Sequence, residues 1–573
     1  MLLEYKANRP SKAEEILFKL CHHQAPSPWA VTSYIANVVN LGVDRRSGEI
    51  AQSRHMPPEL LPLLVSARKQ RDGDLDGALH ALEGSGGDYP VRSKIAHARR
   101  AIFHQKQDHS SLAIEGMKFL QDEPDRLLIP FTIATAGAAE YVKRDDILRF
   151  AIRRLLRDRD RIMNDPDLLR RFWNHGLSAS LTVFDIDGAV TLLRKAKGLR
   201  VPGAAARLED LLQVRQETED WRDILDAVYQ SMRAKIHDPS DSVETGLVKL
   251  VVPAAAFRKN PIDYPGFRSD IRFVVKTIAR TLTSAGLDFQ VTGQILNHGK
   301  LSSSVPSFSY HTISRDRKAL HFKETDRPSR FSFDTGGYAG WSDFSTKSVD
   351  ALDLPSVDYD EALAFFRSEQ VSIIEGNISK YAQADLAFAE TLPEKFVFIG
   401  LQVIGDAVQR LAYASPFAMM DEVIETCLEK GLSVVVKRHP QDKNGQISDD
   451  LRCRVEKGHI TLSTASIHTL IAKSEAVCVI NSGVGAEALL HEKPVYVFGR
   501  ADYMQACFVC EHAGDFAKQF SLGRTRLPAD QLHRFWYLLR NSYAVSITDR
   551  EKSARWIRER VLRHLRETGV LSA

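Results

Sequence analysis

The chain has 573 residues, of which 44% are hydrophobic and 26% are charged, and its formal net charge is +4. This length allows three or four domains, and the composition is that of an ordinary globular protein. So small a net charge gives no reason to expect nucleic acid as a partner, and no apolar run approaches the roughly 18 residues that a membrane-spanning helix needs.

The chain's first 15 residues and its cysteines bear on its compartment. The first 15 residues mix acidic and basic side chains and lack the apolar core of a secretory signal. The six cysteines are unevenly spaced, which is typical of a reducing compartment. These features predict a cytoplasmic protein. Cys507 and Cys510 form a single CxxC, which is a weak signal for a metal site without a second pair.

Residues 1 to about 235 show helical patterns almost throughout. Short amphipathic units recur at intervals of roughly 35 to 40 residues, a period similar to that of stacked helix pairs of the tetratricopeptide (TPR) type. The units span 75–82, 112–120, 147–156 and 186–193. We therefore predict an all-α, TPR-like helical-repeat domain over 1–238, which would bind a protein partner or brace a neighbouring domain. A plain helical bundle is the alternative, and one long helix is expected over 208–234.

The composition changes near residue 240, where the segment 238–242 (Asp-Pro-Ser-Asp-Ser) is predicted to be a linker. The pattern then alternates between short apolar runs and amphipathic segments, which favours an open α/β domain over 239–392. Its expected elements are a strand at 247–253, a helix at 271–285, a strand at 289–292, apolar runs at 319–322 and 331–333, and a helix at about 360–368.

A second α/β pattern covers 393–573. Its continuous β-branched runs are separated by helices, which fits a parallel sheet buried on both faces. Strands are expected at 396–402, 432–437, 459–462, 476–480 and 495–498, and helices at 415–430, 467–472, just after Ser482, 532–543 and 550–568. The predicted fold class is α/β. A GT-B-like pair of Rossmann-type domains, the layout of many glycosyltransferases, would follow the TPR-like domain.

Three segments follow directly after predicted strands of this second domain. They are 402–406, 437–440 and 481–485. Open α/β sheets bind ligands at the carboxyl ends of their strands, so these segments are the candidate binding site. The Ser-Gly-Val-Gly turn at 482–485 would present backbone N–H groups at a helix N-terminus, where anions bind. A tight turn without a ligand is the alternative.

Several motifs occur in a characteristic order. Glu-Thr-Asp-Arg-Pro (324–328) leads to Phe-Ser-Phe-Asp-Thr-Gly-Gly (331–337), and then come Gln-Val-Ile-Gly-Asp (402–406), Lys-Arg-His-Pro (437–440) and Ser-Gly-Val-Gly-Ala-Glu (482–487), with Lys-Pro-Val (493–495), Gly499 and Tyr503 after them. Together they resemble the bacterial capsule-synthesis and O-antigen β-Kdo glycosyltransferases. The resemblance covers about 245–520. It departs at Asp334, where Glu is the commoner residue.

The resemblance implies CMP-β-Kdo as the donor substrate. Backbone N–H groups and a hydroxyl at the 482–485 turn would hold its phosphate, and Lys437 would neutralise the phosphate or the Kdo carboxylate. The implied donor-binding residues are Gln402, Lys437, His439, Pro440, Ser482, Gly483, Gly485, Glu487 and Arg327. Each has a plainer alternative, such as a strand-end lysine at 437, a loop histidine at 439, or at 487 a carboxylate that complements the helix dipole.

The resemblance also implies retention of configuration, which needs two displacements through a covalent adduct. Asp406 is the expected nucleophile, because Gly405 would let the backbone turn its carboxylate into the cleft; an N-cap aspartate is the alternative. Asp334 is the expected acid/base, with Glu324 second. A local surface ion pair is the alternative for Glu324 and Arg327. His439 would also stabilise the leaving phosphate.

Two further features have competing interpretations. Asp358 and Asp360 form a D-x-D string, which in GT-A glycosyltransferases binds a metal. Here it directly precedes a helical run, so we predict a helix N-cap and expect neither a metal nor another cofactor. The basic helix 550–566 could contact an anionic membrane, but packing with a solvated basic face is favoured.

The sequence thus predicts a retaining transferase that moves β-Kdo from CMP-Kdo to a capsule, O-antigen or related glycan. The acceptor is expected to be lipid-linked, and the enzyme peripheral at the inner face of the inner membrane. A transferase for another CMP-sugar, such as sialic acid, is one alternative. A helical-repeat scaffold with a degenerate, non-catalytic transferase domain is the other.

Overall fold

The computed structural model describes most of the chain and divides it into two compact units. Unit 1 comprises Met1–Ser180, Asp187–Glu209 and Ile236–Pro239, and unit 2 comprises Leu181–Ile186, Asp210–Lys235 and Ser240–Ala573. The expected linker at 238–242 and Gly405 lie outside the described residues. The described residues are 15, 18–19, 26–35, 47–142, 144–237, 247–257, 266–294, 299–301, 303–386, 390–403, 406–442 and 445–572.

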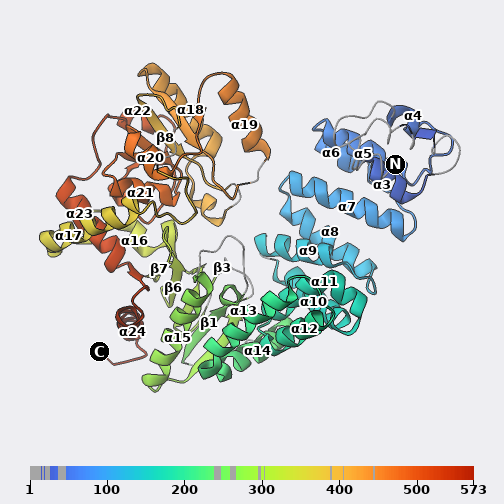
Figure 1. Ribbon diagram of the computed structural model, residues 1–573, viewed down its shortest axis with the longest axis horizontal. Coiled ribbons are helices and arrows are strands. Elements are labelled where there is room, and N and C mark those ends of the chain that lie inside the picture. Colours follow the sequence, from blue (N-terminus) through green and yellow to red (C-terminus); the bar gives the residue numbers. More distant parts are fainter. Residues whose placement is uncertain are drawn as a thin grey trace. The chain divides into compact units, whose positions relative to one another are not determined.

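Helices and the turns between them make up the described residues of unit 1 (Figure 1). Consecutive helices pack against one another, α8 on α9 and α9 on α10, as in a helical repeat. Each of the four predicted amphipathic units lies largely within one helix: α6, α8, α10 or α12. The helices are α3 (Pro28–Tyr34), α4 (Ser47–Ala51), α5 (Leu61–Arg71), α6 (Leu75–His80), α7 (Tyr89–Gln105), α8 (His109–Asp122), α9 (Ile129–Tyr141), α10 (Asp145–Asn164), α11 (Pro166–Thr182) and α12 (Ile186–Gly198), followed by α13 (Ala204–Glu217), which continues into unit 2.

Arg154 of α10 ties α10 to the end of α8. Its side chain is buried, and its guanidinium donates hydrogen bonds to the carbonyl oxygens of Leu120, Glu123 and Arg126 at 2.5, 2.6 and 2.6 Å. The last carbonyls of a helix lack intrahelical donors, and here the guanidinium N–H groups of Arg154 supply hydrogen-bond donors at the end of α8.

The expected long helix over 208–234 is wrong. The chain forms α13, a 3-10 turn η2 (Glu219–Trp221) and then α14 (Arg222–His237). At the break the Thr218 hydroxyl donates to the carbonyl of Val214 at 2.9 Å. Trp221 is buried, with its ring centroid 6.3 Å from that of Phe257. Burial of this large apolar side chain favours the break over a continuous helix.

The first sheet of unit 2 has the strand order β14-β7-β6-β4-β1-β2. The pairs β2–β1, β1–β4 and β4–β6 are parallel, whereas β6–β7 and β7–β14 are antiparallel. The strands are β1 (Val248–Pro253), β2 (Phe289–Gln294), β4 (Ser307–Tyr310), β6 (Ala319–Glu324), β7 (Arg330–Asp334) and β14 (Ala544–Ser546). Helix α15 (Phe267–Ser284) connects β1 to β2, and β3 (Gly299–Lys300) pairs with β5 (Thr312–Ile313) beside the sheet.

The second sheet has the order β10-β9-β8-β11-β12-β13, and every pair in it is parallel. On β11, Val477 and Val479 pack into one apolar cluster, whereas Ala476 and Cys478 pack into another. Both faces are therefore buried, as the β-branched runs predict. The strands are β8 (Phe396–Gly400), β9 (Ser433–Lys437), β10 (Thr461–Leu462), β11 (Ala476–Val479), β12 (Val495–Val497) and β13 (Phe508–Val509), with helices α18 (Pro416–Glu429), α19 (Gly445–Glu456), α20 (Ile467–Lys473), α21 (Gly483–Leu490) and α22 (Asp515–Gln519).

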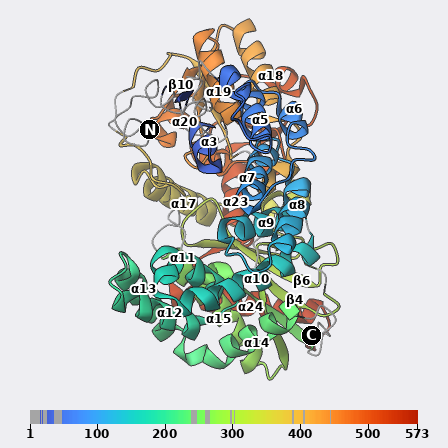
Figure 2. The same ribbon diagram turned by 90° about the vertical axis from the view of Figure 1, so that its right-hand side faces the viewer.

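Two stretches of chain link the sheets. Helix α17 (Tyr359–Gln370) precedes β8, and α23 (Ala529–Asn541) follows β13 and lies beside α17 (Figures 1 and 2). After α23 the chain returns to the first sheet, where Val545 of β14 pairs with Phe331 of β7.

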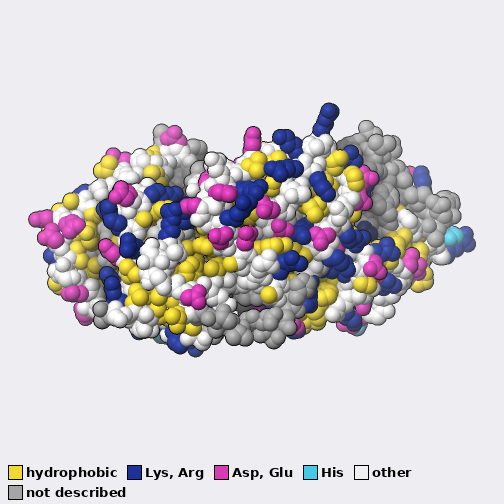
Figure 3. All heavy atoms as spheres, turned by 90° about the horizontal axis from the view of Figure 1, so that it is seen from below, with side chains coloured by type: hydrophobic (Ala, Val, Ile, Leu, Met, Phe, Trp, Pro, Cys, Tyr) yellow, Lys and Arg dark blue, Asp and Glu magenta, His cyan; other side chains and the backbone are white. Residues whose placement is uncertain are grey.

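The closing helix α24 (Arg550–Glu567) uses its apolar side for packing. Ile557, Val561 and Leu565 are fully buried. The indole N–H of Trp556 donates to the carbonyl of Asn541 at 3.0 Å. On the face shown in Figure 3, basic and acidic side chains are interspersed. Among the described residues, no helix is both long and apolar enough to cross a membrane.

Candidate functional site

A cavity of about 450 Å³ opens in unit 2 between the carboxyl end of β6 and the carboxyl ends of β8 and β9. The structure thus brings the three strand-end segments of the second domain together with the Glu-Thr-Asp motif of the first. Of the twelve predicted site residues, nine line this cavity: Glu324, Gln402, Asp406, Lys437, His439, Pro440, Ser482, Gly483 and Glu487. Asp334, Arg327 and Gly485 are not among the lining residues.

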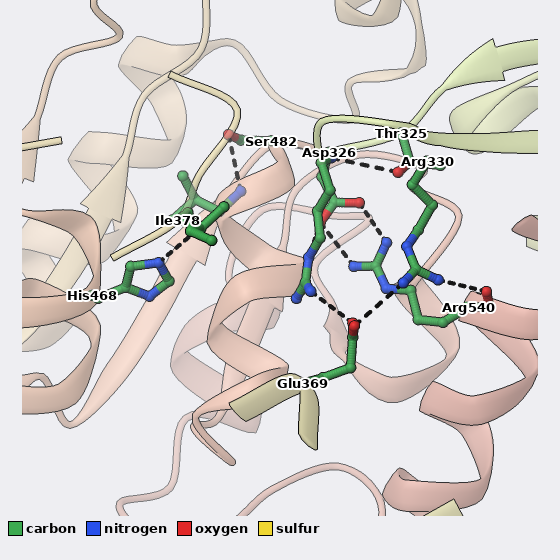
Figure 4. Close-up of polar contacts among 10 residues, drawn as sticks. Thr325, Asp326, Arg330, Glu369, Ile378, His468, Ser482 and Arg540 are labelled. Atoms are coloured by element: carbon green, nitrogen blue, oxygen red, sulfur yellow. Dashed lines mark hydrogen bonds and ion pairs between the residues drawn. The ribbon is translucent and has the colours of Figure 1, made fainter. Parts of the chain in front are cut away.

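The Ser482 turn joins β11 to α21. Ser482 is the N-cap of α21, and its Oγ accepts a hydrogen bond from the amide of Val484 at 3.4 Å. A Cβ at Gly483 would lie 2.8 Å from the Cβ of Asp326, so this glycine lets the segment after β6 approach the turn (Figure 4). A Cβ at Gly485 would lie 2.5 Å from the Tyr503 hydroxyl oxygen. Gly485 is therefore needed for packing on Tyr503, whereas Gly483 faces the cavity.

His439 lies just after β9, with its protonation state fixed by its neighbours. Its Nδ1 accepts a hydrogen bond from the amide of Gln441 at 3.1 Å, which leaves the proton on Nε2. Burial lowers the pKa of His439. The imidazole is therefore neutral at pH 7 and offers an N–H donor. The Tyr381 ring packs edge-on against it, with centroids 4.9 Å apart.

Lys437 and Gln402 add one cation and one acceptor to the cavity. The Lys437 ammonium donates to the carbonyl of Ala465 at 2.5 Å and to Oε1 of Gln383 at 3.2 Å. Burial lowers the pKa of Lys437, and Glu390 and Glu487 oppose this effect. The Oε1 of Gln402 is buried and has no hydrogen-bond partner in the described part of the chain. A ligand that donates a hydrogen bond would satisfy this oxygen.

Glu324 is an anion held by two lysines. Its carboxylate contacts the ammonium groups of Lys323 at 2.6 Å and Lys380 at 3.7 Å and accepts a hydrogen bond from the Tyr310 hydroxyl at 2.6 Å. Burial opposes its ionisation, but the lysines and these hydrogen bonds outweigh burial and lower the pKa of Glu324 to about 2. The suggested surface ion pair between Glu324 and Arg327 is wrong, because both side chains are buried and each has other partners.

Arg327 belongs to a buried network of ion pairs rather than to the cavity wall. Figure 4 shows other members of this network, Asp326, Arg330, Glu369 and Arg540. Its Nη1 contacts Glu369 of α17 at 2.7 Å, and Arg330 contacts the same carboxylate at 3.3 Å. Beside them, Arg540 of α23 holds Asp326 through two contacts of 2.6 and 2.8 Å. Arg327 thus holds the segment after β6 against α17, and it is not among the residues that line the cavity.

The two aspartates predicted to be catalytic have different surroundings. The Asp334 carboxylate accepts hydrogen bonds from the amides of Gly336, Gly337, Asp343 and Phe344 at 2.7, 3.3, 2.7 and 3.1 Å. It holds the glycine turn after β7 and lies outside the cavity lining.

Asp406, by contrast, is exposed and lines the cavity. It also caps the 3-10 helix η8 (Ala407–Leu411) by accepting from the amide of Val408 at 3.4 Å. The N-cap alternative is therefore observed together with the position on the cavity wall. Asp358 is an N-cap too, as predicted: it accepts from the amide of Glu361 at 2.8 Å at the start of α17.

Glu487 of α21 is a buried carboxyl group on the cavity wall, 2% exposed. Burial and the neighbouring Asp326 carboxylate raise the pKa of Glu487 to about 8, against the opposing effects of Ser379, Arg327 and Arg540. At neutral pH it is mostly protonated and can donate a hydrogen bond.

Sequence reasoning missed several residues of the cavity wall. The sequence did not indicate Lys323, Lys380 or Tyr381. Lys323 lies within β6, and Lys380 and Tyr381 come from the connection between α17 and β8, which has no periodic pattern. Asp326 stands inside the Glu-Thr-Asp-Arg-Pro motif, so its place in that motif was the available signal. The thiols of Cys507 and Cys510 are free and lie in different apolar clusters.

Comparisons with known proteins match the part of the chain that contains the second sheet. Residues 367–511, about a quarter of the chain, match the family model described as "Capsule polysaccharide biosynthesis protein". This match spans β8, β9, β11 and the Ser482 turn. The comparison with curated proteins finds no match.

Solved structures with low similarity include two transferases from Thermosulfurimonas dismutans. One is titled "KpsC, beta Kdo 2,4 transferase", at 13% identity and a TM-score of 0.32, covering 54% of this chain and 98% of that one. The second is titled "KpsC, beta Kdo 2,7 transferase", at 14% identity and a TM-score of 0.30, covering 55% and 98%. An O-GlcNAc transferase mutant from Thermobaculum terrenum has 11% identity and a TM-score of 0.22, covering 92% and 94%.

Proposed function

We propose that this protein is a glycosyltransferase of surface-polysaccharide synthesis that moves β-Kdo from CMP-Kdo to a glycan acceptor. One observation carries the proposal: Ser482, His439 and Lys437 converge on one cavity at the carboxyl edge of a parallel sheet. The match to a capsule-synthesis family over 367–511 supports a role in polysaccharide synthesis. The choice of CMP-Kdo rests on the ordered motifs of the sequence.

The cavity wall offers a set of groups suited to a nucleotide phosphate. The amides at the start of α21 carry the positive end of the helix dipole, and the neutral imidazole of His439 supplies an Nε2–H donor. Lys437 supplies a positive charge. Gln402 would accept a hydrogen bond from the nucleotide or the sugar through its unpartnered Oε1.

The chemistry would be a double displacement. The Asp406 carboxylate would attack C2 of Kdo as the bond from C2 to the phosphate oxygen breaks, which gives a covalent adduct and releases CMP. An acceptor hydroxyl would then attack C2 and give up its proton while the Asp406 carboxylate leaves. We assign the base for that second step to Glu324 rather than Asp334. Glu324 lines the cavity, whereas Asp334 lies outside the lining and four backbone amides occupy its carboxylate.

The place of the reaction forms part of the same proposal. The acceptor would be a lipid-linked glycan reached from the cytoplasmic side, with the enzyme at the inner face of the membrane. The apolar side of α24 is already buried, so membrane contact would have to use other residues.

Release of CMP from CMP-Kdo by the purified protein tests the proposal. We expect turnover by the wild type and losses of about 10²-fold or more in Asp406→Ala and His439→Ala. Asp358→Ala is the matched control, because it removes a helix-capping aspartate outside the cavity. Full activity in both site variants would refute the site assignment. Turnover of CMP-sialic acid instead of CMP-Kdo would refute the donor, and failure to bind CMP in calorimetry would favour the scaffold alternative.

A further inference from the structure

Two carboxyl groups that line the cavity lie beside the Ser482 turn. Asp326 comes from the segment after β6, and Glu487 comes from α21. Asp326 packs against Gly483, and Arg540 holds its carboxylate by two contacts of 2.6 and 2.8 Å. Glu487 is 2% exposed and makes no ion pair among the described residues. Asp326 therefore has Arg540 as an ion-pair partner, and Glu487 has no ion-pair partner among the described residues.

This asymmetry decides which of the two carries a proton. An anion without a paired cation is unfavourable in a buried site, and a second anion nearby makes it more so. Burial opposes the ionisation of Asp326, but Arg540 and Arg327 together hold the pKa of Asp326 well below its usual range. The pKa of Glu487, by contrast, is raised to about 8 by burial and by the Asp326 carboxylate. The charged and titratable groups that face Glu487 are Asp326, Arg327, Arg540, Lys437 and Tyr503, and Ser379 makes a hydrogen bond with it.

We propose that Glu487 is the proton donor to the departing phosphate, and that Asp326 is a positioning residue that keeps Glu487 protonated. This inference rests on the proposed function and adds the source of the proton in its first step. Glu487 lies one helical turn beyond Gly483, the residue that begins α21, so its carboxyl group opens into the cavity next to the turn that would hold the phosphate.

The proton balance of the step is simple. As the bond from C2 to the phosphate oxygen breaks, its electron pair stays on that oxygen, which takes the proton from Glu487. C2 meanwhile bonds to the Asp406 carboxylate. After CMP leaves, the Glu487 carboxylate regains a proton from water.

His439 is poorly suited to the same task. Its imidazole is neutral, and its Nδ1 already accepts the amide hydrogen of Gln441. The remaining Nε2–H donates a hydrogen bond but is far too weak an acid to protonate a phosphate, whereas a protonated carboxyl group with a pKa near the working pH is well matched to proton transfer.

The first test is Glu487→Gln, which keeps the shape and the hydrogen-bond donor but cannot give up a proton. We expect kcat for CMP release to fall about 10²- to 10⁴-fold while CMP binding in calorimetry stays within a few-fold of the wild type. Glu369→Gln is the control, because it changes a carboxylate of the nearby ion-pair network that does not line the cavity. Undiminished kcat in Glu487→Gln overturns the inference. Absence of turnover in the wild type instead refutes the proposed function.

The second test follows pH. The kcat of the wild type should fall as pH rises through about 8, where Glu487 loses its proton. In the paired variant Asp326→Asn with Arg540→Gln, this fall in kcat should occur at lower pH, because the negative charge of Asp326 no longer raises the pKa of Glu487. CMP affinity, measured in parallel, should weaken above about pH 8 in the wild type and stay level in Glu487→Gln. This binding measurement also decides the matter if the paired variant fails to fold. The inference is overturned if kcat falls at the same pH in the wild type and the paired variant. It is also overturned if CMP affinity has the same pH dependence in the wild type and Glu487→Gln.

Discussion

Breaking the ion pair between Asp326 and Arg540 on one side only should destabilise unit 2 strongly. The side chains are 11% and 2% exposed and meet through two contacts, and Arg540 also lies over the Trp536 ring at 4.3 Å from its centroid. Asp326→Asn or Arg540→Gln leaves one buried charge without its partner, for which we expect a loss of about 3–5 kcal/mol in the free energy of unfolding. Replacing both removes both charges and should cost at least about 2 kcal/mol less than the sum of the single losses.

A double-mutant cycle measures this coupling. Urea unfolding of the four proteins at pH 7.5, followed by tryptophan fluorescence and by circular dichroism, gives the four free energies. Arg452 and Asp449 of α19 provide a control cycle, because they form an ion pair at 2.8 Å with both side chains 69% exposed and should show little coupling. If the losses at Asp326 and Arg540 add to within about 0.5 kcal/mol, the reasoning about a buried, mutually dependent pair is refuted.

Three further predictions concern other parts of the molecule. The folded-state pKa of Glu487, about 8, is above its ordinary 4.5, so its contribution to stability is fully present below pH 4.5 and is lost as pH rises through 8. The free energy of unfolding of Glu487→Gln relative to the wild type should therefore rise between pH 5 and pH 9, and a constant difference would contradict this. Gly485→Ala should lower unfolding stability by about 1–3 kcal/mol in urea titrations, because its Cβ would meet the Tyr503 hydroxyl; an unchanged midpoint would show that the turn can shift. Arg154→Met keeps the apolar stem but removes three donors to carbonyls, so the melting temperature of unit 1 should fall, whereas Arg170→Met, at a side chain 53% exposed whose partner Asp167 is 81% exposed, should change it little. Equal melting temperatures in these two variants would contradict the role given to Arg154.

The sequence predicted the second sheet well because its strands are buried on both faces. Continuous β-branched runs such as Val-Val-Val at 434–436 strongly favour a strand that is buried on both faces. The first sheet was harder. Strand β4 contains Ser307 and Ser309, which are fully buried and interrupt the apolar pattern. Strand β14 pairs with β7, which lies more than 200 residues earlier, and no local pattern reports such a pairing.

The candidate site was predictable where side chains follow strands, and less so where tertiary contacts decide their role. Lys437, His439 and Ser482 lie at strand ends that topology brings together, so position alone indicated them. Asp334 also follows a strand, but the chain folds back and its four backbone amides enclose the carboxylate. Whether a carboxylate faces a cavity or its own loop depends on that fold-back, which residue spacing does not encode.

The position of β14 in the first sheet has a consequence for folding during synthesis. The first sheet begins with β1 at Val248, but its edge strand β14 ends only at Ser546, whereas the last strand of the second sheet ends at Val509. The second sheet can therefore form while β7 still has an open edge. An unpaired edge is a place where a strand of another chain can add. A fragment that stops before Ala544 would keep this edge open permanently, so aggregation of such a fragment would reflect the missing strand rather than a defect in the cavity.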